Sequence, residues 1–361
     1  MDVRDFDFHL PPELIAQEPI ADRAAARLMV VDRASGALTH TRITALPAIL
    51  QPADLVVVNN TRVFPARLLG HRDPSGGAVE CLLVTRYESD TYPTCTRHVP
   101  GTCQTWQALM HPGQKLHPGA QVTFDGTHRI HGEVLEQKFF GRRTLHLWTD
   151  DGTPLDHAID AIGHVPLPPY IKRDDRAADR DRYQTVFARE RGSIAAPTAG
   201  LHFTPDLLAA LAKRGVERAE ITLHVGYGTF QPVRVDRVED HRLEAEHYEI
   251  APAAADAINR ALADRRRVLA VGTTTTRTLE AVAQANRGRI VAGAGATDLF
   301  IYPGFEFRAV TALLTNFHMP KSSLLMLVSA FAGRELVRKA YDAAVADRYR
   351  FYSYGDAMLI L

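Results

Sequence analysis

The chain has 361 residues, more than one typical domain core holds, so we expect two domains. Forty-two basic residues balance 42 acidic ones, which excludes a global positive field, so any RNA binding must use local patches. The cysteines Cys81, Cys95 and Cys103 form no C-x-x-C pair and cannot build a disulfide framework. The first residues lack the basic start of a signal peptide, and no apolar run approaches ~18 residues. We therefore expect a cytoplasmic protein with no membrane segment.

The first half of the chain predicts one core strand followed by a β-rich insertion. Residues 54–60, "DLVVVNN", read as a strand of a larger sheet. Between residues 65 and 151, short β-type runs alternate with turn signals, which is typical of a small barrel or sandwich. Residues 95–104 read as a surface loop within it. We predict an inserted β-barrel-like domain at 65–151, within a discontinuous α/β catalytic domain formed by 1–64 and 152–361.

The second half predicts alternating helices and strands. The apolar spacing gives helices at 205–214, 253–266, from about 277, at 322–332 and at 334–346, and strands at 219–225, 267–271, 298–302 and 309–314. The first helix carries its own signals, with Thr204 as N-cap, Pro205 at the first position and Gly215 past the end. The alternation predicts a mixed sheet flanked by helices.

A helix start after one strand carries four threonines. In "VGTTTTRTLE", a β-type run ends at Gly272, four consecutive threonines follow, and a helix begins. Free backbone N–H groups and hydroxyls at a helix N-terminus suit an anion or a carboxylate. A well-capped helix without a ligand explains the same pattern, and the sequence leaves both open.

Three histidines follow a similar pattern. His224 precedes a Gly226-x-Gly228 turn, His318 follows Asn316 at a strand end, and His202 is the last residue but one of the stretch "SIAAPTAGLHF", which carries no formal charge. Ligands bind outside the carboxyl ends of strands in open α/β sheets. A single histidine there is more often structural, but three of them favour a shared pocket.

Cations gather at two junctions. Arg62 and Arg67 follow the first strand, and Lys172 and Arg173 end the proline-rich "GHVPLPPYIKR". They suit a local phosphate-binding surface, although a linker with solvated charges is the simpler interpretation of the sequence. Phosphate-loop, dinucleotide, zinc-protease and nucleophile-elbow motifs are absent, and the polar residues 241–247 match no metal site.

Together these segments resemble one family. "NNTRVFPARL", "AAPTAGLHF", "TLHVGYGTFQPV", "VGTTTTRTLE", "TNFHMPKSSLLMLVSAFAG" and "YRFYSYGDAMLIL" are similar, in order and from Phe6 to Leu361, to the S-adenosylmethionine:tRNA ribosyltransferase-isomerases of queuosine biosynthesis. The chain departs from the family where Glu244 replaces a usual histidine.

The resemblance implies a reaction on tRNA. The ribosyl group of S-adenosylmethionine moves to 7-aminomethyl-7-deazaguanine at the wobble position and is rearranged, giving epoxyqueuosine, adenine and methionine. A base beside the sulfonium would remove a 5′ proton, which suits an imidazole with a pKa of ~6.5. The implied partners are tRNA and S-adenosylmethionine, with no membrane, no further cofactor and no metal, and we expect a monomer.

The resemblance also implies roles for individual residues. His202 is our first candidate for the base, with His224 and His318 as partners and Thr198 orienting the sugar. Asp356 either hydrogen-bonds a base or an amine, or caps the last strand. Expected cosubstrate contacts are Gly226, Gly228, Thr229, Gly272, Thr273, Thr274, Arg277 and Asn316, with Thr273, Thr274 and the helix start at Thr276 and Arg277 holding the methionyl carboxylate. Expected tRNA contacts are Asn60, Arg62, Arg67, Tyr170, Lys172 and Arg173.

Two other functions remain open on sequence alone. One is a non-catalytic RNA-binding module that uses the β insertion and the arginines, although the neutral charge and the grouped histidines speak against it. The other is a transferase acting on a free nucleoside, which the neutral charge favours.

Overall fold

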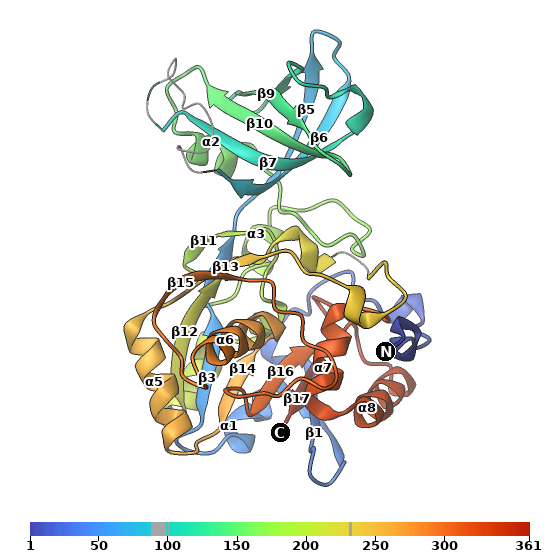
Figure 1. Cartoon of the computed structure of the whole chain (residues 1–361), viewed down its shortest axis with the longest axis vertical. Helices are drawn as coiled ribbons and strands as arrows, with labels where there is room; N and C mark the ends of the chain where they lie inside the picture. The colour runs from blue at the N-terminus through green and yellow to red at the C-terminus, as the bar shows by residue number, and fades with distance from the viewer. Residues whose placement is uncertain (88–98, 100, 231–232) are drawn as a thin grey trace. The chain divides into compact units, whose positions relative to one another are not determined.

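A computed structural model describes residues 1–87, 99, 101–230 and 233–361 of the chain (Figure 1). Packing divides these residues into two compact units. The main unit contains Met1–Arg62, Pro168–Arg173 and Asp181–Leu361, and the barrel unit contains Val63–Leu167 and Asp174–Arg180. The predicted fold class, an α/β part with a mixed sheet and a β-barrel part, is confirmed. The boundaries and functions assigned to the two predicted domains stay a prediction.

The described part of the main unit is built on a nine-stranded mixed sheet in the order β15-β13-β12-β3-β14-β16-β17-β1-β2. Parallel pairs join β12 to β3, β3 to β14, β14 to β16 and β17 to β1, while the other neighbours are antiparallel. The strands are β1 (Arg27–Val31), β2 (Leu38–Arg42), β3 (Leu55–Asn59), β12 (Glu217–Leu223), β13 (Glu246–Ile250), β14 (Val268–Val271), β15 (Gly293–Thr297), β16 (Ala312–Asn316) and β17 (Ala357–Ile360). Two short strands, β4 (Thr61–Val63) and β11 (Glu190–Ser193), pair separately.

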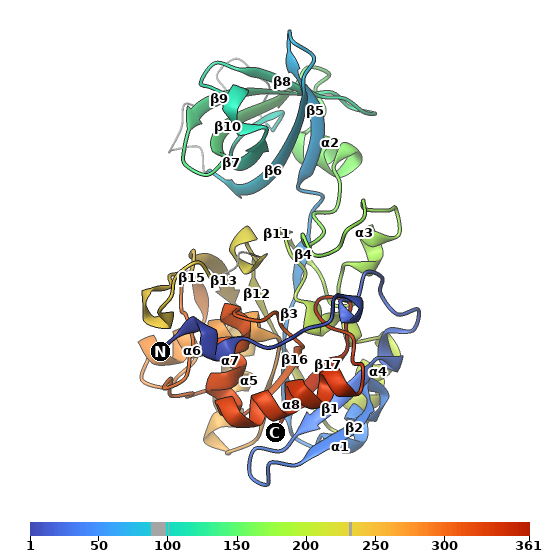
Figure 2. The ribbon, with the colours of Figure 1, turned by 90° about the vertical axis from the view of Figure 1, so that its right-hand side faces the viewer.

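Helices cover both faces of this sheet (Figures 1 and 2). On one face Val57, Ala270 and Leu313 pack against α5 (Pro252–Ala263), α6 (Thr273–Ala285), α7 (Ser323–Ala332) and α8 (Arg334–Ala346). On the other face Val56 and Leu269 pack against α1 (Leu46–Ile49) and α4 (Pro205–Lys213). All five residues of β3 are buried, as a strand covered on both faces requires.

Most predicted elements of the main unit are confirmed, and two differ. Thr204 caps α4 through a hydrogen bond from the N–H of Leu207 to its hydroxyl, 3.1 Å long. Helix α6 begins at Thr273, four residues before the predicted start, because Gly272 at φ 90° turns the chain directly from β14 into the helix. The strand predicted at 298–302 is wrong, since β15 ends at Thr297, whose hydroxyl accepts the N–H of Leu299 and turns the chain away.

The described part of the barrel unit is a closed six-stranded antiparallel barrel in the order β10-β7-β6-β5-β8-β9. Its strands are β5 (Arg67–Asp73), β6 (Ala78–Arg86), β7 (Cys103–His111), β8 (Gln121–Phe124), β9 (Ile130–Gln137) and β10 (Arg142–Thr149). Helix α2 (Leu155–Ile162) packs Leu155 and Ile159 against the barrel core, and α3 (Asp179–Arg182) is a single turn on the connection back to the main unit.

Residues 95–98 and 100 of the loop predicted at 95–104 lie outside the described residues, and the last two residues of that loop belong to β7. Cys81 is a buried free thiol whose pKa burial raises. Cys103 is disulfide-bonded, which the sequence did not lead us to expect. Within the described ranges, no helix is long and apolar enough to cross a membrane.

Candidate functional site

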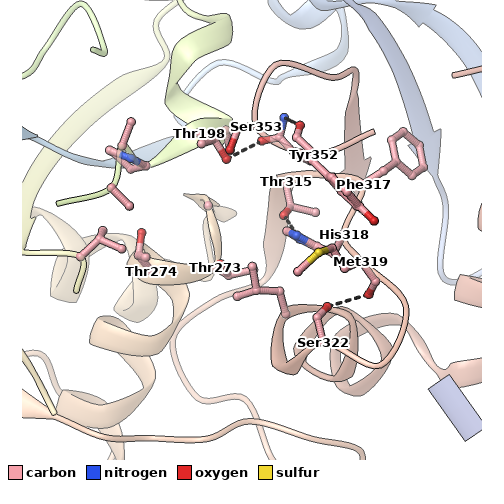
Figure 3. Close-up of a pocket in the computed structure, with 18 of the residues that line it drawn as sticks. Thr198, Thr273, Thr274, Thr315, Phe317, His318, Met319, Ser322, Tyr352 and Ser353 are labelled. Carbon is pink, nitrogen blue, oxygen red and sulfur yellow. Dashed lines mark hydrogen bonds between the residues drawn. The ribbon is translucent and has the colours of Figure 1, made fainter. Parts of the chain in front are cut away.

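A pocket of about 690 Å³, counting the part open to solvent, lies at the carboxyl ends of β14 and β16 in the main unit. Its walls come from segments far apart in the sequence: residues 195–199, 272–274, 315–319 and 352–353, together with Tyr170, Val225, Ser322 and Leu324. Figure 3 shows Thr273 and Thr274 at the start of α6, His318 beside Thr315, and Tyr352 and Ser353 on a third side. The predicted strand-end location is therefore where a pocket lies.

The start of α6 offers one wall of this pocket. Three of its threonine hydroxyls turn back onto the helix: Thr275, Thr276 and Thr278 donate to the carbonyls of Val271, Gly272 and Thr274 over 2.8–3.1 Å. Thr274 lines the pocket and is 7% exposed, and its buried Oγ1 has no hydrogen-bond partner. An unpaired hydroxyl beside the free N–H groups of a helix N-terminus is suited to an anionic ligand group.

None of the described lining residues is acidic, lysine or arginine. The single titratable imidazole on the described walls is that of His318, and burial lowers its pKa to about 3. Its Nε2 lies 2.7 Å from the hydroxyl of Thr315, and its backbone N–H donates to the hydroxyl of Tyr341 over 2.9 Å. His318 is therefore a neutral imidazole at neutral pH, held from both sides at the pocket wall.

Asn316 connects the pocket to His202. Its amide oxygen accepts from the hydroxyl of Thr198, and its amide nitrogen donates to Nε2 of His202 and to the carbonyl of Tyr352, each over 3.2 Å. His202 does not line this pocket but a neighbouring cavity that also includes Arg23 and Ser353. Burial lowers the pKa of His202 to about 4, and the carboxylate of Asp356 opposes that shift.

His224 lies away from both cavities, although its neighbour Val225 lines the first. The hydroxyl of Thr61 is 2.8 Å from Nδ1 of His224 and 2.8 Å from the hydroxyl of Ser193. Ser193 in turn accepts the N–H of Val225 over 2.8 Å. Burial lowers the pKa of His224. The three predicted histidines are thus not brought into one pocket, and only His318 faces the first one.

Arg277 is engaged elsewhere. Its guanidinium forms a buried ion pair with Glu246 and donates to the carbonyl of Leu299 over 2.8 Å. The second carboxylate oxygen of Glu246 accepts the N–H of Gly226 over 2.8 Å. Neither Arg277, Gly226 nor Gly228 lines the pocket, and Thr229 lies in a short helical turn where its side chain is not described. These contacts give Arg277 a packing role between α6 and β13.

Asp356 is nearly buried, and its carboxylate is fully engaged. One oxygen accepts the N–H of Arg27, and the other accepts the guanidinium of Arg27 and the N–H of Arg350, over 2.8–3.2 Å. These contacts, at the start of β17, favour the capping alternative for Asp356.

The residues predicted to contact tRNA have different environments. Asn60 is buried. Its side-chain oxygen accepts a hydrogen bond from the hydroxyl of Thr222, and its backbone carbonyl accepts one from the N–H of Arg189. Tyr170 lines the pocket, 4.7 Å from the ring of Tyr352, and its hydroxyl is 2.6 Å from that of Ser353. Burial raises the pKa of Tyr170 to about 12, so its phenol stays protonated.

The four predicted cations are more accessible. Arg62 and Lys172 are exposed, while Arg173 pairs with Glu18 over 2.9 Å in the main unit. Arg67 belongs to the barrel unit and pairs with Glu80 over 2.7 Å.

Sequence reasoning missed part of the pocket. Tyr352, Ser353, Met319 and Ser322 line it, and none was predicted as a site residue. Tyr352 and Ser353 lie within the quoted motif "YRFYSYGDAMLIL", which was the available signal. Across the described residues there is no group of three or more His, Cys, Asp or Glu side chains placed to hold a metal ion.

Comparison with known proteins identifies the family. Residues 3–360 match the family of queuosine biosynthesis proteins. An S-adenosylmethionine:tRNA ribosyltransferase-isomerase of Geobacter sulfurreducens is 52% identical over 99% of both chains, and that of Desulfitobacterium hafniense is 49% identical over the full length of both. The crystal structure of S-adenosylmethionine tRNA ribosyltransferase from Thermotoga maritima is 36% identical and covers 99% of this chain and 100% of its own, with a TM-score of 0.54. The chain belongs to the queuosine biosynthesis protein family.

Proposed function

We propose that this chain transfers the ribosyl group of S-adenosylmethionine to 7-aminomethyl-7-deazaguanine at the wobble position of tRNA and isomerises it, giving epoxyqueuosine-tRNA, adenine and methionine. The observation that carries the proposal is the convergence, on one pocket, of four segments that resemble the family: 195–199, 272–274, 315–319 and 352–353. Full-length relatives named for this reaction support it. We expect the enzyme to act as a monomer in the cytoplasm.

The start of α6 is proposed to hold the methionyl carboxylate. Thr273 and Thr274 line the pocket there, and the described lining residues include no lysine or arginine that would bind the carboxylate instead. Backbone N–H groups and the unpartnered hydroxyl of Thr274 would replace the water that the carboxylate loses. In this arrangement Arg277 supports the helix through Glu246 and does not touch the ligand.

The uncharged walls favour deprotonation next to the sulfonium. The described lining residues include no acidic side chain to stabilise the positive sulfur, which increases the acidity of the adjacent 5′ carbon. Removing the 5′ proton converts the cationic sulfonium into a neutral ylide and puts the positive charge on the base. The pocket therefore holds one positive charge before and after the proton transfer. Because burial destabilises both charged states, it adds little to the free energy of protonating the imidazole in this step.

Among the three histidines, the geometry favours His318 as the base. It is the one that lines the pocket, it is neutral, and Thr315 orients its ring. His202 becomes a positioning residue, since it reaches the pocket only through Asn316, which also holds Thr198. This reverses the order predicted from the sequence.

The test is turnover of the purified protein with S-adenosylmethionine and tRNA carrying the aminomethyl-deazaguanine. We expect released adenine, measured by chromatography, and a matching mass gain on the tRNA. Reactions with unmodified tRNA, or without S-adenosylmethionine, are the controls. Neither product from the complete reaction would refute the proposal, and turnover on the free base or nucleoside alone would favour a small-molecule transferase instead.

A further inference from the structure

A turn of the barrel unit presents two adjacent phenylalanines to solvent. Phe139 is 85% exposed and Phe140 is 88% exposed, and they lie between β9 and β10. The other large hydrophobic side chains that are exposed in the described residues reach at most 64%. Aromatic rings so far from any core contribute nothing to packing, and an exposed apolar pair marks an interaction site.

The backbone of this turn works against a phenylalanine. Phe140 and Gly141 have φ values of 56° and 79°, and the N–H of Arg142 donates to the carbonyl of Phe139 over 3.2 Å. Two positive φ values at the centre of a hairpin turn are typical of type I′, which prefers Asn-Gly. A bulky residue in the left-handed region costs free energy, and such a cost points to a function.

A buried arginine holds the turn in place. Arg143 is 2% exposed, and its guanidinium donates to the carbonyls of Lys138 and Arg142 at the base of the turn. It also donates to the carbonyls of Leu116 and Gly113 in the neighbouring loop. The two rings are therefore carried on a braced hairpin, and a preorganised surface loses little entropy when it binds.

The charges beside the rings are mainly positive. Residues 138–143 include Lys138, Arg142 and Arg143 and no acidic residue. Lys138 pairs with Glu136, just outside this segment, over 3.5 Å, and lies 3.1 Å from the hydroxyl of Tyr87, while Arg142 donates to the side chain of Gln107 over 3.3 Å. Aromatic faces beside cations are what single-stranded nucleic acids require, since bases stack on the rings and phosphates meet the cations.

We propose that Phe139 and Phe140 stack on unpaired bases of the RNA substrate, with Lys138 and Arg142 facing its phosphates. The inference rests on the proposed function, because that function identifies the RNA as a tRNA, whose loops supply unpaired bases. It assigns an RNA-binding role to a segment that the sequence motifs did not include.

The test is the affinity for fluorescein-labelled substrate tRNA, measured by anisotropy at one fixed salt concentration. Phe140→Asn introduces the residue that this turn type prefers, so we expect the variant to keep its fold. The double variant carries Phe139→Ser as well. We expect about a 5- to 150-fold weaker affinity for each ring that stacks. Phe139→Tyr keeps an aromatic face and should retain the affinity, and Val291→Ser removes a 51% exposed side chain elsewhere as a matched control.

Further readouts separate the possible outcomes. The affinity for S-adenosylmethionine and the slope of tRNA affinity against salt should not change, because the phenylalanines carry no charge. A blunt RNA duplex without loops should bind the wild type and the double variant equally. Unchanged tRNA affinity in the double variant would overturn the inference. If the double variant instead changed the self-association of the protein and not its tRNA affinity, the turn would be a protein contact and the inference would also be wrong. A wild type that binds loop RNA through these rings but makes no adenine would contradict the proposed function and leave this inference standing.

Discussion

Replacing Thr274 by valine should stabilise the free protein and weaken its binding of S-adenosylmethionine. The hydroxyl is buried without a hydrogen bond, and leaving such a group unpaired costs about 1–3 kcal/mol. Valine has nearly the same shape and no polar atom, so we expect about 1 kcal/mol of added stability, or roughly 2–4 °C in Tm. A hydrogen bond to a charged carboxylate contributes about 1.5–3 kcal/mol, so the affinity should fall about 10- to 150-fold.

Thermal unfolding without ligand and calorimetric titration with S-adenosylmethionine measure the two effects. Thr278→Val is the matched control, because its side chain is also buried but its hydroxyl donates to the carbonyl of Thr274. That variant should lower Tm and leave the affinity unchanged. A lower Tm in Thr274→Val would mean that the hydroxyl has a partner in the free protein. An unchanged affinity would place the carboxylate elsewhere.

His318→Gln should lower kcat for adenine release about 10²- to 10⁴-fold while keeping the affinity for S-adenosylmethionine, and a smaller loss than in His202→Gln would contradict the assignment of the base. Burial lowers the pKa of His318 to about 3 and that of His202 to about 4, whereas unfolded imidazoles titrate near 6.5. The unfolded state therefore binds more protons below pH 6.5. Stability that is present above that pH should be lost towards pH 4, by about 1.4 kcal/mol per pH unit for each histidine. His318→Gln should make the plot of Tm against pH shallower, and an unchanged slope would count against it. Glu246→Ala leaves the buried Arg277 without its partner and should cost about 3–5 kcal/mol in thermal unfolding, while Glu246→Gln, which still accepts the N–H of Gly226, should cost less. Equal stability of Glu246→Ala and the wild type would refute the packing role.

The sequence predicted local structure well where neighbouring residues decide it. The capping of α4 by Thr204 depends on residues within one turn, and the burial of β3 follows from its run of apolar side chains. The strand predicted at 298–302 failed because a β-type composition cannot show that Thr297 turns the chain away after β15.

The site was predicted less completely because its geometry depends on distant pairings. The sequence placed Arg277 beside the threonines of α6, but its partner Glu246 is 31 residues away, on β13. His202 and Asn316 were assigned to different roles, although one hydrogen bond joins them across 114 residues. Tyr352 and Ser353 reach the pocket because β17 inserts between β16 and β1. No local sequence pattern predicts that strand order.

The place of β17 in the sheet has a consequence for how the protein is made. This strand follows every other described strand in the chain, yet it pairs β16 with β1, so the early hairpin of β1 and β2 has no neighbour until β17 emerges from the ribosome. Until then the growing chain exposes two strand edges and lacks the wall formed by Tyr352 and Ser353. A nascent chain without β17 therefore lacks part of the pocket, and the open edges of β16 and β1 are where a chaperone would bind it.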